Sequence, residues 1–309
     1  MIEHHIKKIF KASNSIKKVY PKLFIDYTVI MTRYLYFSII LLLASCGGGG
    51  GGTSSGGGPA GPNDGNPDGT NSVFTQKISQ NNLAIFGRAD VSSSFLANLG
   101  KAYEAMLQNS SSIDAAMKSN YNSTISSQNI YQRVGKGSPS NYSDMNAIAS
   151  SPYGDNAVDY IFESGSGSDQ ISEVIEHLLH TITAVGFKFA FPTTWDYNNT
   201  NSQLYLAMQE AIDAGDYNIT SYAALQGDAE AYRRVLTQEY AYWLILAEWD
   251  YFVTAGNVEE GYGNGNSEFK LGKPSEVITN NPLGHKLYED YVEKILSPPN
   301  KDLIISLFP

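Results

Sequence analysis

The sequence predicts a single α+β domain dominated by helix, with a few short strands early and long helices late. Short apolar runs bounded by turn residues come first, and longer runs with helical spacing follow them. Residues 73–309 contain neither an internal repeat nor a second linker, so one domain is the simplest organisation. Among the 309 residues, 42% are hydrophobic and one is cysteine, so stability has to come from a core rather than from an intramolecular disulfide.

The predicted strands are short. Leu83–Ala89 reads LAIFGRA and is the first of them, and Ala157–Phe162 reads AVDYIF and is the last. The stretch Asn109–Ser151 between them is rich in serine and asparagine. We expect one strand in it, near Ile130–Val134.

The predicted helices are longer and lie mostly in the second half. The earliest begins near Ser92, whose hydroxyl can cap it, and it continues through Leu107 on an apolar face. Four more are expected at Ser168–Ala184, Ser202–Ala214, Ala229–Thr254 and Pro282–Leu296. In the last of these, Asn281 and Pro282 stand at the N-cap and first helical position.

Residues 1–45 have the organisation of a signal peptide. Basic residues precede Tyr34–Ala44, an uncharged run of 11 residues that is too short to span a bilayer. Leu43-Ala44-Ser45-Cys46 follows and resembles the lipobox of bacterial lipoproteins. This resemblance implies cleavage before Cys46 and attachment of a diacylglycerol to its thiol. Met31 is an alternative start, because Met31–Ser45 is a complete short signal, and a buried apolar segment with an incidental cysteine is the competing interpretation.

The segment 46–72 consists almost entirely of Gly, Ser, Pro, Asn, Asp and Thr. Because such a segment cannot bury apolar surface, we expect a disordered tether ahead of a globular domain at 73–309. In the sorting rule of Gram-negative lipoproteins, Gly47 rather than Asp after the lipidated cysteine implies the outer membrane. The expected location is therefore the bacterial envelope, with the domain held on a membrane through its lipid.

Charge limits the partners of this domain. Removal of residues 1–45 takes away seven basic and two acidic side chains and leaves 14 basic and 29 acidic residues, a formal charge of −15. This balance argues against nucleic acid as a partner, because its phosphates would be repelled. A surplus of carboxylates suits a protein that binds cations.

One segment carries residues suited to chemistry. Ile171–Gly186 reads ISEVIEHLLHTITAVG, with an apolar stripe on one helical face and polar residues on the other. The polar face holds Glu173, Glu176, His177, His180 and Thr181. Only three histidines occur in residues 46–309, and two of them lie within this one helical turn. Two imidazoles at that spacing can bind one ion.

The same segment resembles the active-site helix of the zincins, zinc metallopeptidases with the motif H-E-x-x-H. In Glu176-His177-Leu178-Leu179-His180 the first two residues of that motif are transposed. The resemblance implies a zincin-like fold, a zinc ion bound by His177, His180 and a later glutamate, and peptide or protein substrates. Glu176 would then be catalytic and polarise the zinc-bound water.

Glu239 is the predicted third ligand. It shares a helical face with apolar residues, where an ionised carboxylate costs several kcal/mol unless a cation or strong donors meet it. Glu248 is the second choice, and His285 is expected to be an ordinary surface residue.

A simpler hypothesis remains open beside the metal site. The polar face could be a solvated surface whose glutamates and histidines pair at i, i+4, with Arg233 or Arg234 as the partner of Glu239. The domain would then be a non-catalytic binding or structural module of an envelope lipoprotein. The tether and the lack of an intact catalytic motif support this alternative.

Overall fold

The structure is a computed structural model, and it describes residues 66, 68–254, 257–259 and 268–309. All of them belong to one compact unit, Gly50–Pro309. The predicted signal peptide, the lipidated Cys46 and most of the tether lie outside the described residues. Contacts of the domain begin slightly ahead of residue 73, since the amide of Ser150 donates a 2.8 Å hydrogen bond to the carbonyl of Gly69.

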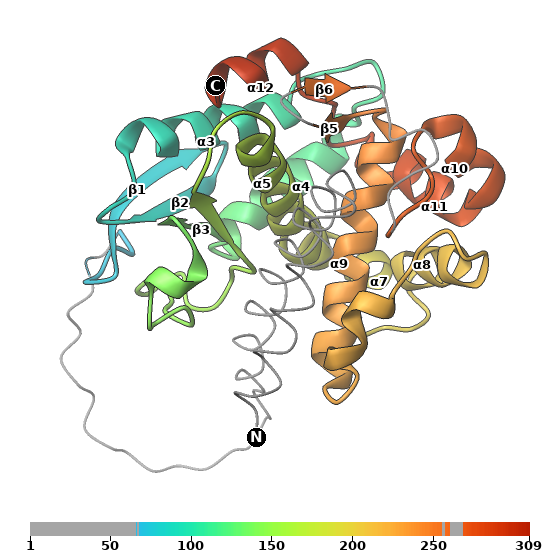
Figure 1. Ribbon diagram of the computed structural model, residues 1–309, viewed down its shortest axis with the longest axis horizontal. Coiled ribbons are helices and arrows are strands. Elements are labelled where there is room, and N and C mark those ends of the chain that lie inside the picture. Colours follow the sequence, from blue (N-terminus) through green and yellow to red (C-terminus); the bar gives the residue numbers. More distant parts are fainter. Residues whose placement is uncertain (1–65, 67, 255–256, 260–267) are drawn as a thin grey trace, which may run out of the picture. The chain divides into compact units, whose positions relative to one another are not determined.

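Strands come early in the chain, as predicted, and they form a four-stranded mixed sheet (Figure 1). Its strands, in spatial order, are β1 (Phe74–Gln80), β2 (Leu83–Arg88), β3 (Tyr131–Lys136) and β4 (Tyr160–Glu163). Strands β1 and β2 form an antiparallel hairpin, and β2, β3 and β4 pair in parallel. Asn81 and Asn82 turn the hairpin with φ of 44° and 70°, the left-handed conformation that two-residue hairpin turns require.

Three of the four strands were predicted, and β1 was not. Its sequence, FTQKISQ, is mostly polar, and only Phe74 among its residues is buried. An edge strand of this composition lacks the apolar alternation on which strand prediction depends.

Helices make up most of the remaining described structure. They are α3 (Ser93–Met106), α4 (Ala115–Ser127), α5 (Gly167–His180), α6 (Lys188–Ala190), α7 (Pro192–Trp195), α8 (Gln203–Asp213), α9 (Ala229–Glu248), α10 (Pro274–Asn280), α11 (Pro282–Leu287) and α12 (Lys301–Leu307). Two π-helices, η2 (Thr181–Phe187) and η4 (Tyr288–Val292), continue α5 and α11, and two 3₁₀ segments are η1 (Pro139–Asn141) and η3 (Thr220–Leu225). A short hairpin, β5 (Phe252–Thr254) with β6 (Asn257–Glu259), follows α9. Within the described residues, none of the helices combines the length and the apolar character needed to cross a bilayer.

The five predicted helices exist, but two of them end earlier than predicted. The helix predicted as Pro282–Leu296 ends with η4 at Val292. Ser92 caps α3, since its hydroxyl accepts from the amide of Phe95 at 3.2 Å, as expected. The helix predicted as Ala229–Thr254 ends at Glu248, because Asp250 takes a left-handed φ of 48° that stops the helix. Helix α4 and the short helices α6, α7, α10 and α12 were not predicted. Helix α4 buries only Tyr121 and Ile125, so its apolar periodicity is weak.

Helix α5 packs against both β4 and α9 (Figure 1). Its apolar stripe is buried, with Val174, Leu178 and Leu179 fully covered. Two of its polar residues reach these neighbours: Glu173 accepts from the amide of Phe162 on β4 at 2.9 Å, and Nε2 of His180 lies 3.6 Å from Oε2 of Glu239 on α9.

Candidate metal centre

Three elements supply a cluster of histidine and carboxylate side chains. Asp159 directly precedes β4, Glu176, His177 and His180 lie on the last turns of α5, and Glu239 lies in the middle of α9. Their ligand atoms form two groups, each with all atoms within 4.8 Å of one another, and His180 belongs to both.

The first group is Glu176, His180 and Glu239. His180 is 1% exposed and Glu239 is 4% exposed, and the Nε2 atom of His180 lies 3.6 Å from Oε2 of Glu239. Within the part of the chain that the structure describes, this buried Nε2 atom has no hydrogen-bond partner. A buried polar nitrogen without a partner is costly, and a bound ion would satisfy it. The arrangement therefore has the donor set of a metal site.

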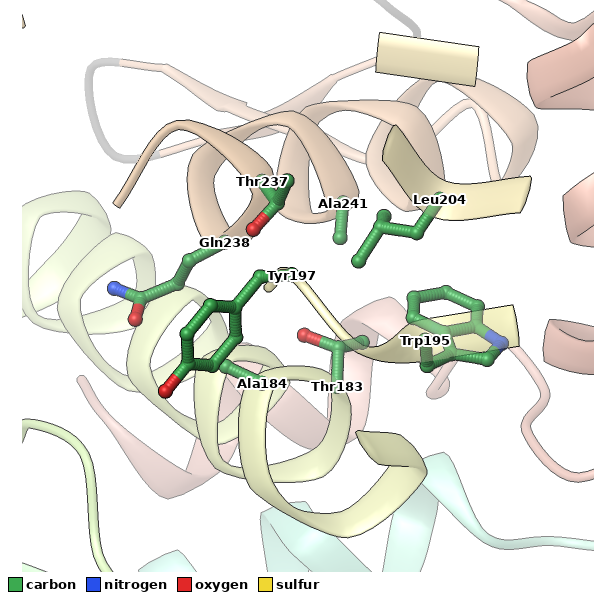
Figure 2. A pocket seen from close by; sticks show the side chains of 8 residues that line it. All are labelled: Thr183, Ala184, Trp195, Tyr197, Leu204, Thr237, Gln238 and Ala241. Carbon is green, nitrogen blue, oxygen red and sulfur yellow. The ribbon is translucent and has the colours of Figure 1, made fainter. Parts of the chain in front are cut away.

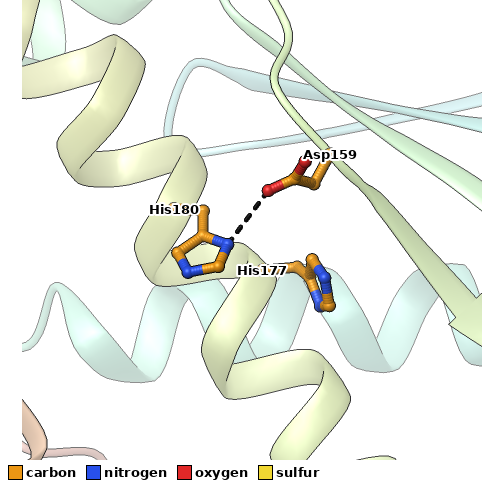
Figure 3. A group of neighbouring side chains, drawn as sticks. All are labelled: Asp159, His177 and His180. Atoms are coloured by element: carbon orange, nitrogen blue, oxygen red, sulfur yellow. Dashed lines mark hydrogen bonds and ion pairs between the residues drawn. The ribbon is translucent and has the colours of Figure 1, made fainter. Parts of the chain in front are cut away.

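The second group is Asp159, His177 and His180 (Figure 3). Here the nitrogens already have partners: Nδ1 of His180 lies 3.0 Å from Oδ2 of Asp159, and Nδ1 of His177 lies 2.8 Å from the carbonyl of Glu173. Gln238 adds its amide nitrogen, 2.8 Å from Oδ2 of Asp159 and 3.1 Å from Nδ1 of His180. A hydrogen-bonded network thus fits this group better than an ion does.

The predicted ligands are divided between the two groups. His180 and Glu239 lie together, as predicted, and Glu176 joins them at ligand distance. His177 lies instead with Asp159, so the position expected for one histidine ligand is taken by Glu176. Glu248, the second choice for the third ligand, accepts a 2.9 Å hydrogen bond from Nδ1 of His285.

The solvated-face hypothesis fits only part of the helix. Glu173 and His177 do pair at i, i+4, with 3.7 Å between Oε2 and Nδ1. His180, however, is buried, and Arg233 contacts Asn198 at 3.4 Å rather than Glu239. A buried carboxylate next to a buried imidazole is not an ordinary surface pair.

Carboxylates outnumber cations in this region, and the pKa values reflect the imbalance. Burial and the charge of Glu239 raise the pKa of Glu176 to about 7, although His177 opposes the shift. Burial and Glu239 likewise raise the pKa of Glu268 to about 7. Burial lowers the pKa of His180, but the charges of Glu239 and Asp159 outweigh it and raise the pKa well above its usual value. Without a metal, protons therefore compensate part of the negative charge.

The pKa of Asp159 shifts in the opposite direction from the pKa values of Glu176 and Glu268. Burial raises its pKa, but the hydrogen bond and charge of His180 outweigh burial and hold the pKa below its usual value. Asp159 is thus an ionised acceptor beside the imidazole, with the charge of Arg234 contributing a smaller effect in the same direction.

Strand β3 holds the cluster in place through Gln132. This residue is fully buried, and its amide nitrogen donates to the carbonyl of Asp159 at 2.9 Å. Its amide oxygen accepts from the hydroxyl of Thr181 at 2.6 Å, directly after His180. The π-helix η2 also begins at Thr181, and such segments within α-helices are frequent at functional sites.

Three residues of the region were not found from the sequence: Asp159, Gln238 and Glu268. Asp159 had a usable signal, because it is the single charged residue in the apolar run AVDYIF. Gln238 had a weaker one, as a polar residue beside Glu239 in a helix that is apolar on most sides. Glu268, whose carboxylate accepts from the hydroxyl of Tyr222, follows a polar, glycine-rich stretch of sequence and had none.

A narrow crevice adjoins Gln238 (Figure 2). It lies between η2, α8 and α9 and is lined by Thr183, Ala184, Trp195, Tyr197, Leu204, Thr237, Gln238 and Ala241. The crevice leaves no room for a water-sized molecule. In this conformation it does not receive a substrate.

Comparison of the chain with protein-family models, with curated proteins and with solved structures found no match. The functional argument therefore rests on the geometry of the site.

Proposed function

We propose that this chain is a lipid-anchored protein of the bacterial envelope whose domain binds one divalent transition metal through Glu176, His180 and Glu239. Zinc is the first candidate. The observation that carries the metal proposal is the buried Nε2 atom of His180, which makes no hydrogen bond in the described part of the chain and lies beside two glutamates, 3.6 Å from Oε2 of Glu239. The envelope anchor rests on the lipobox-like segment ending at Cys46 and on the tether that follows it.

The donor set and spacing suit such an ion. Imidazole nitrogen and carboxylate oxygen are both zinc ligands, and two ligands of a tetrahedral zinc ion lie about 3.4 Å apart. The 3.6 Å between Nε2 of His180 and Oε2 of Glu239 is close to that separation. His180 and Glu239 would need little movement to bind the ion, whereas Glu176 is placed only within 4.8 Å of them. The ion would replace the protons on these groups.

We extend the proposal to hydrolysis of peptides, as the zincin resemblance implies. Three protein ligands leave one zinc position for water, which is the arrangement of catalytic zinc sites. In the reaction, the water oxygen would bond to the peptide carbonyl carbon, the carbon–nitrogen bond would break, and the water proton would pass to the leaving amine. Glu176→Gln tests the ligand role of Glu176. Loss of metal supports that role, whereas retained metal without turnover would make Glu176 the general base and leave His180 and Glu239 as the ligands among these three residues.

A non-catalytic metal protein is the second candidate. The crevice beside the cluster has no space for water, let alone for a peptide. A metal in this place would then join α5 to α9 and stabilise the domain, as structural zinc does.

Metal analysis tests the site itself. The full-length protein, purified without chelator and then supplied with Zn²⁺, is expected to hold one ion per chain. His180→Ala and Glu239→Ala should abolish binding, whereas His285→Ala, the matched control on α11, should keep it. His177→Ala should also keep it, because His177 lies in the other group. Unchanged stoichiometry in His180→Ala would remove the proposal.

A further inference from the structure

The two ring nitrogens of His180 have different surroundings. Nδ1 lies 3.0 Å from Oδ2 of Asp159, whereas Nε2 faces Glu239 and, in the described part of the chain, has no hydrogen-bond partner. A neutral imidazole carries one proton, and only the bare nitrogen can bind a metal. Which nitrogen is bare therefore decides whether the ring can act as the ligand proposed above.

We propose that Asp159 is the positioning residue that keeps the proton on Nδ1 of His180 and leaves Nε2 free for a metal. This inference rests on the proposed function and extends it to the tautomer of its histidine ligand. An ionised carboxylate only accepts hydrogen bonds, so the short contact with Oδ2 of Asp159 requires Nδ1 to be the donor. Carboxylates that fix a metal-binding histidine in this way contribute to affinity without touching the ion.

Gln238 is the competing partner of Nδ1. Its amide nitrogen lies 3.1 Å from Nδ1 and 2.8 Å from Oδ2 of Asp159. If the amide donated to Nδ1, the proton would sit on Nε2 and the ring could not bind an ion. A bare Nδ1 would then lie 3.0 Å from the ionised Oδ2 of Asp159, and two acceptors at that distance repel each other. Nδ1 is therefore the donor to Asp159, and the amide donates to the same carboxylate. Both donors then converge on Asp159.

The backbone of Asp159 is held on two sides. Gln132 donates to its carbonyl at 2.9 Å, and Arg133 donates to the carbonyl of Val158. Gln132 also accepts from Thr181, the residue after His180. One buried side chain thus connects the residue that orients the imidazole with the helix that carries it, so the Asp159–His180 contact does not depend on a flexible side chain alone.

Asp159→Asn tests the inference, because asparagine keeps the shape but can donate to Nδ1 and thereby move the proton to Nε2. We expect this variant to bind Zn²⁺ 10- to 100-fold more weakly, the range typical of such supporting carboxylates. Asp155→Asn, at an exposed aspartate of the same loop, is the matched control and should bind like the wild type.

A second readout needs no metal. The ¹⁵N shifts of the His180 ring, recorded in chelated protein at a pH where the ring is neutral, show which nitrogen is protonated. We expect Nδ1–H in the wild type and in Gln238→Leu, and Nε2–H in Asp159→Asn. If Asp159→Asn does not fold, the comparison of the wild type with Gln238→Leu decides alone. A wild-type ring with Nε2–H that changes to Nδ1–H in Gln238→Leu would show that Gln238 sets the tautomer, and it would overturn the inference.

The two proposals can fail separately. Absence of zinc binding in a wild type that shows the expected tautomers would refute the metal site and keep the role of Asp159. Zinc binding that is unaffected by Asp159→Asn, with an unchanged tautomer, would refute the positioning role and keep the metal site.

Discussion

Replacing Glu176 by glutamine should remove a pH-dependent loss of stability from the metal-free protein. Burial raises the pKa of Glu176 from 4.5 to about 7, so the folded state holds a proton that the unfolded chain has released in this interval. The resulting stabilisation is complete below pH 4.5 and is lost as the pH rises to about 7. A shift of this size corresponds to roughly 3 kcal/mol as an upper bound, since each pKa unit is about 1.4 kcal/mol.

Urea unfolding of the chelated protein at pH 5 and pH 8 measures this effect. The wild type should lose more free energy of unfolding between the two conditions than Glu176→Gln, by up to about 3 kcal/mol. The raised pKa of His180 also removes stability as the pH rises, but it does so in both proteins. Asp169→Asn, an exposed change on the same helix, is the control and should follow the wild type.

Zinc should raise the free energy of unfolding of the wild type more than that of Glu176→Gln. At pH 8 the ion replaces the lost protons, so it should stabilise the wild type and have less effect on Glu176→Gln. Identical pH dependence of the chelated wild type and Glu176→Gln would refute the reasoning, because it would mean that Glu176 ionises as it does in water.

Three further predictions follow from the same structure. Zinc affinity should fall at least tenfold from pH 7 to pH 6, measured with a competing chelator, because Glu176 and His180 must release protons to bind. Gln132→Leu should lower the free energy of unfolding by about 1–3 kcal/mol, measured by urea, since it leaves the buried hydroxyl of Thr181 and the carbonyl of Asp159 without their partner. Cys46→Ser should move the protein from the membrane to the soluble fraction in cell fractionation, and retention on the membrane would contradict the lipid anchor.

Local interactions explain why much of the fold was predictable. The hydroxyl of Ser92 caps α3 through the amide of Phe95, only three residues away. The stripe of α5 is visible because its apolar residues recur at helical spacing. Where burial is sparse, as in β1 and α4, the pattern fades and prediction failed. The end of α9 depended on the left-handed Asp250, which no periodicity reveals.

By itself the sequence determined that His180 and Glu239 are unusual residues, because each is polar within a helix that has an apolar stripe to bury. Only the tertiary structure decided their companions. Adjacent helical residues point about 100° apart, so Glu176 and His177 can be directed to different neighbours. The packing of α5 between β4 and α9 groups Glu176 with Glu239 and His177 with Asp159. The rotation of α5 about its own axis sets these pairings. It depends on contacts with distant segments of the chain, which the sequence of the helix by itself does not reveal.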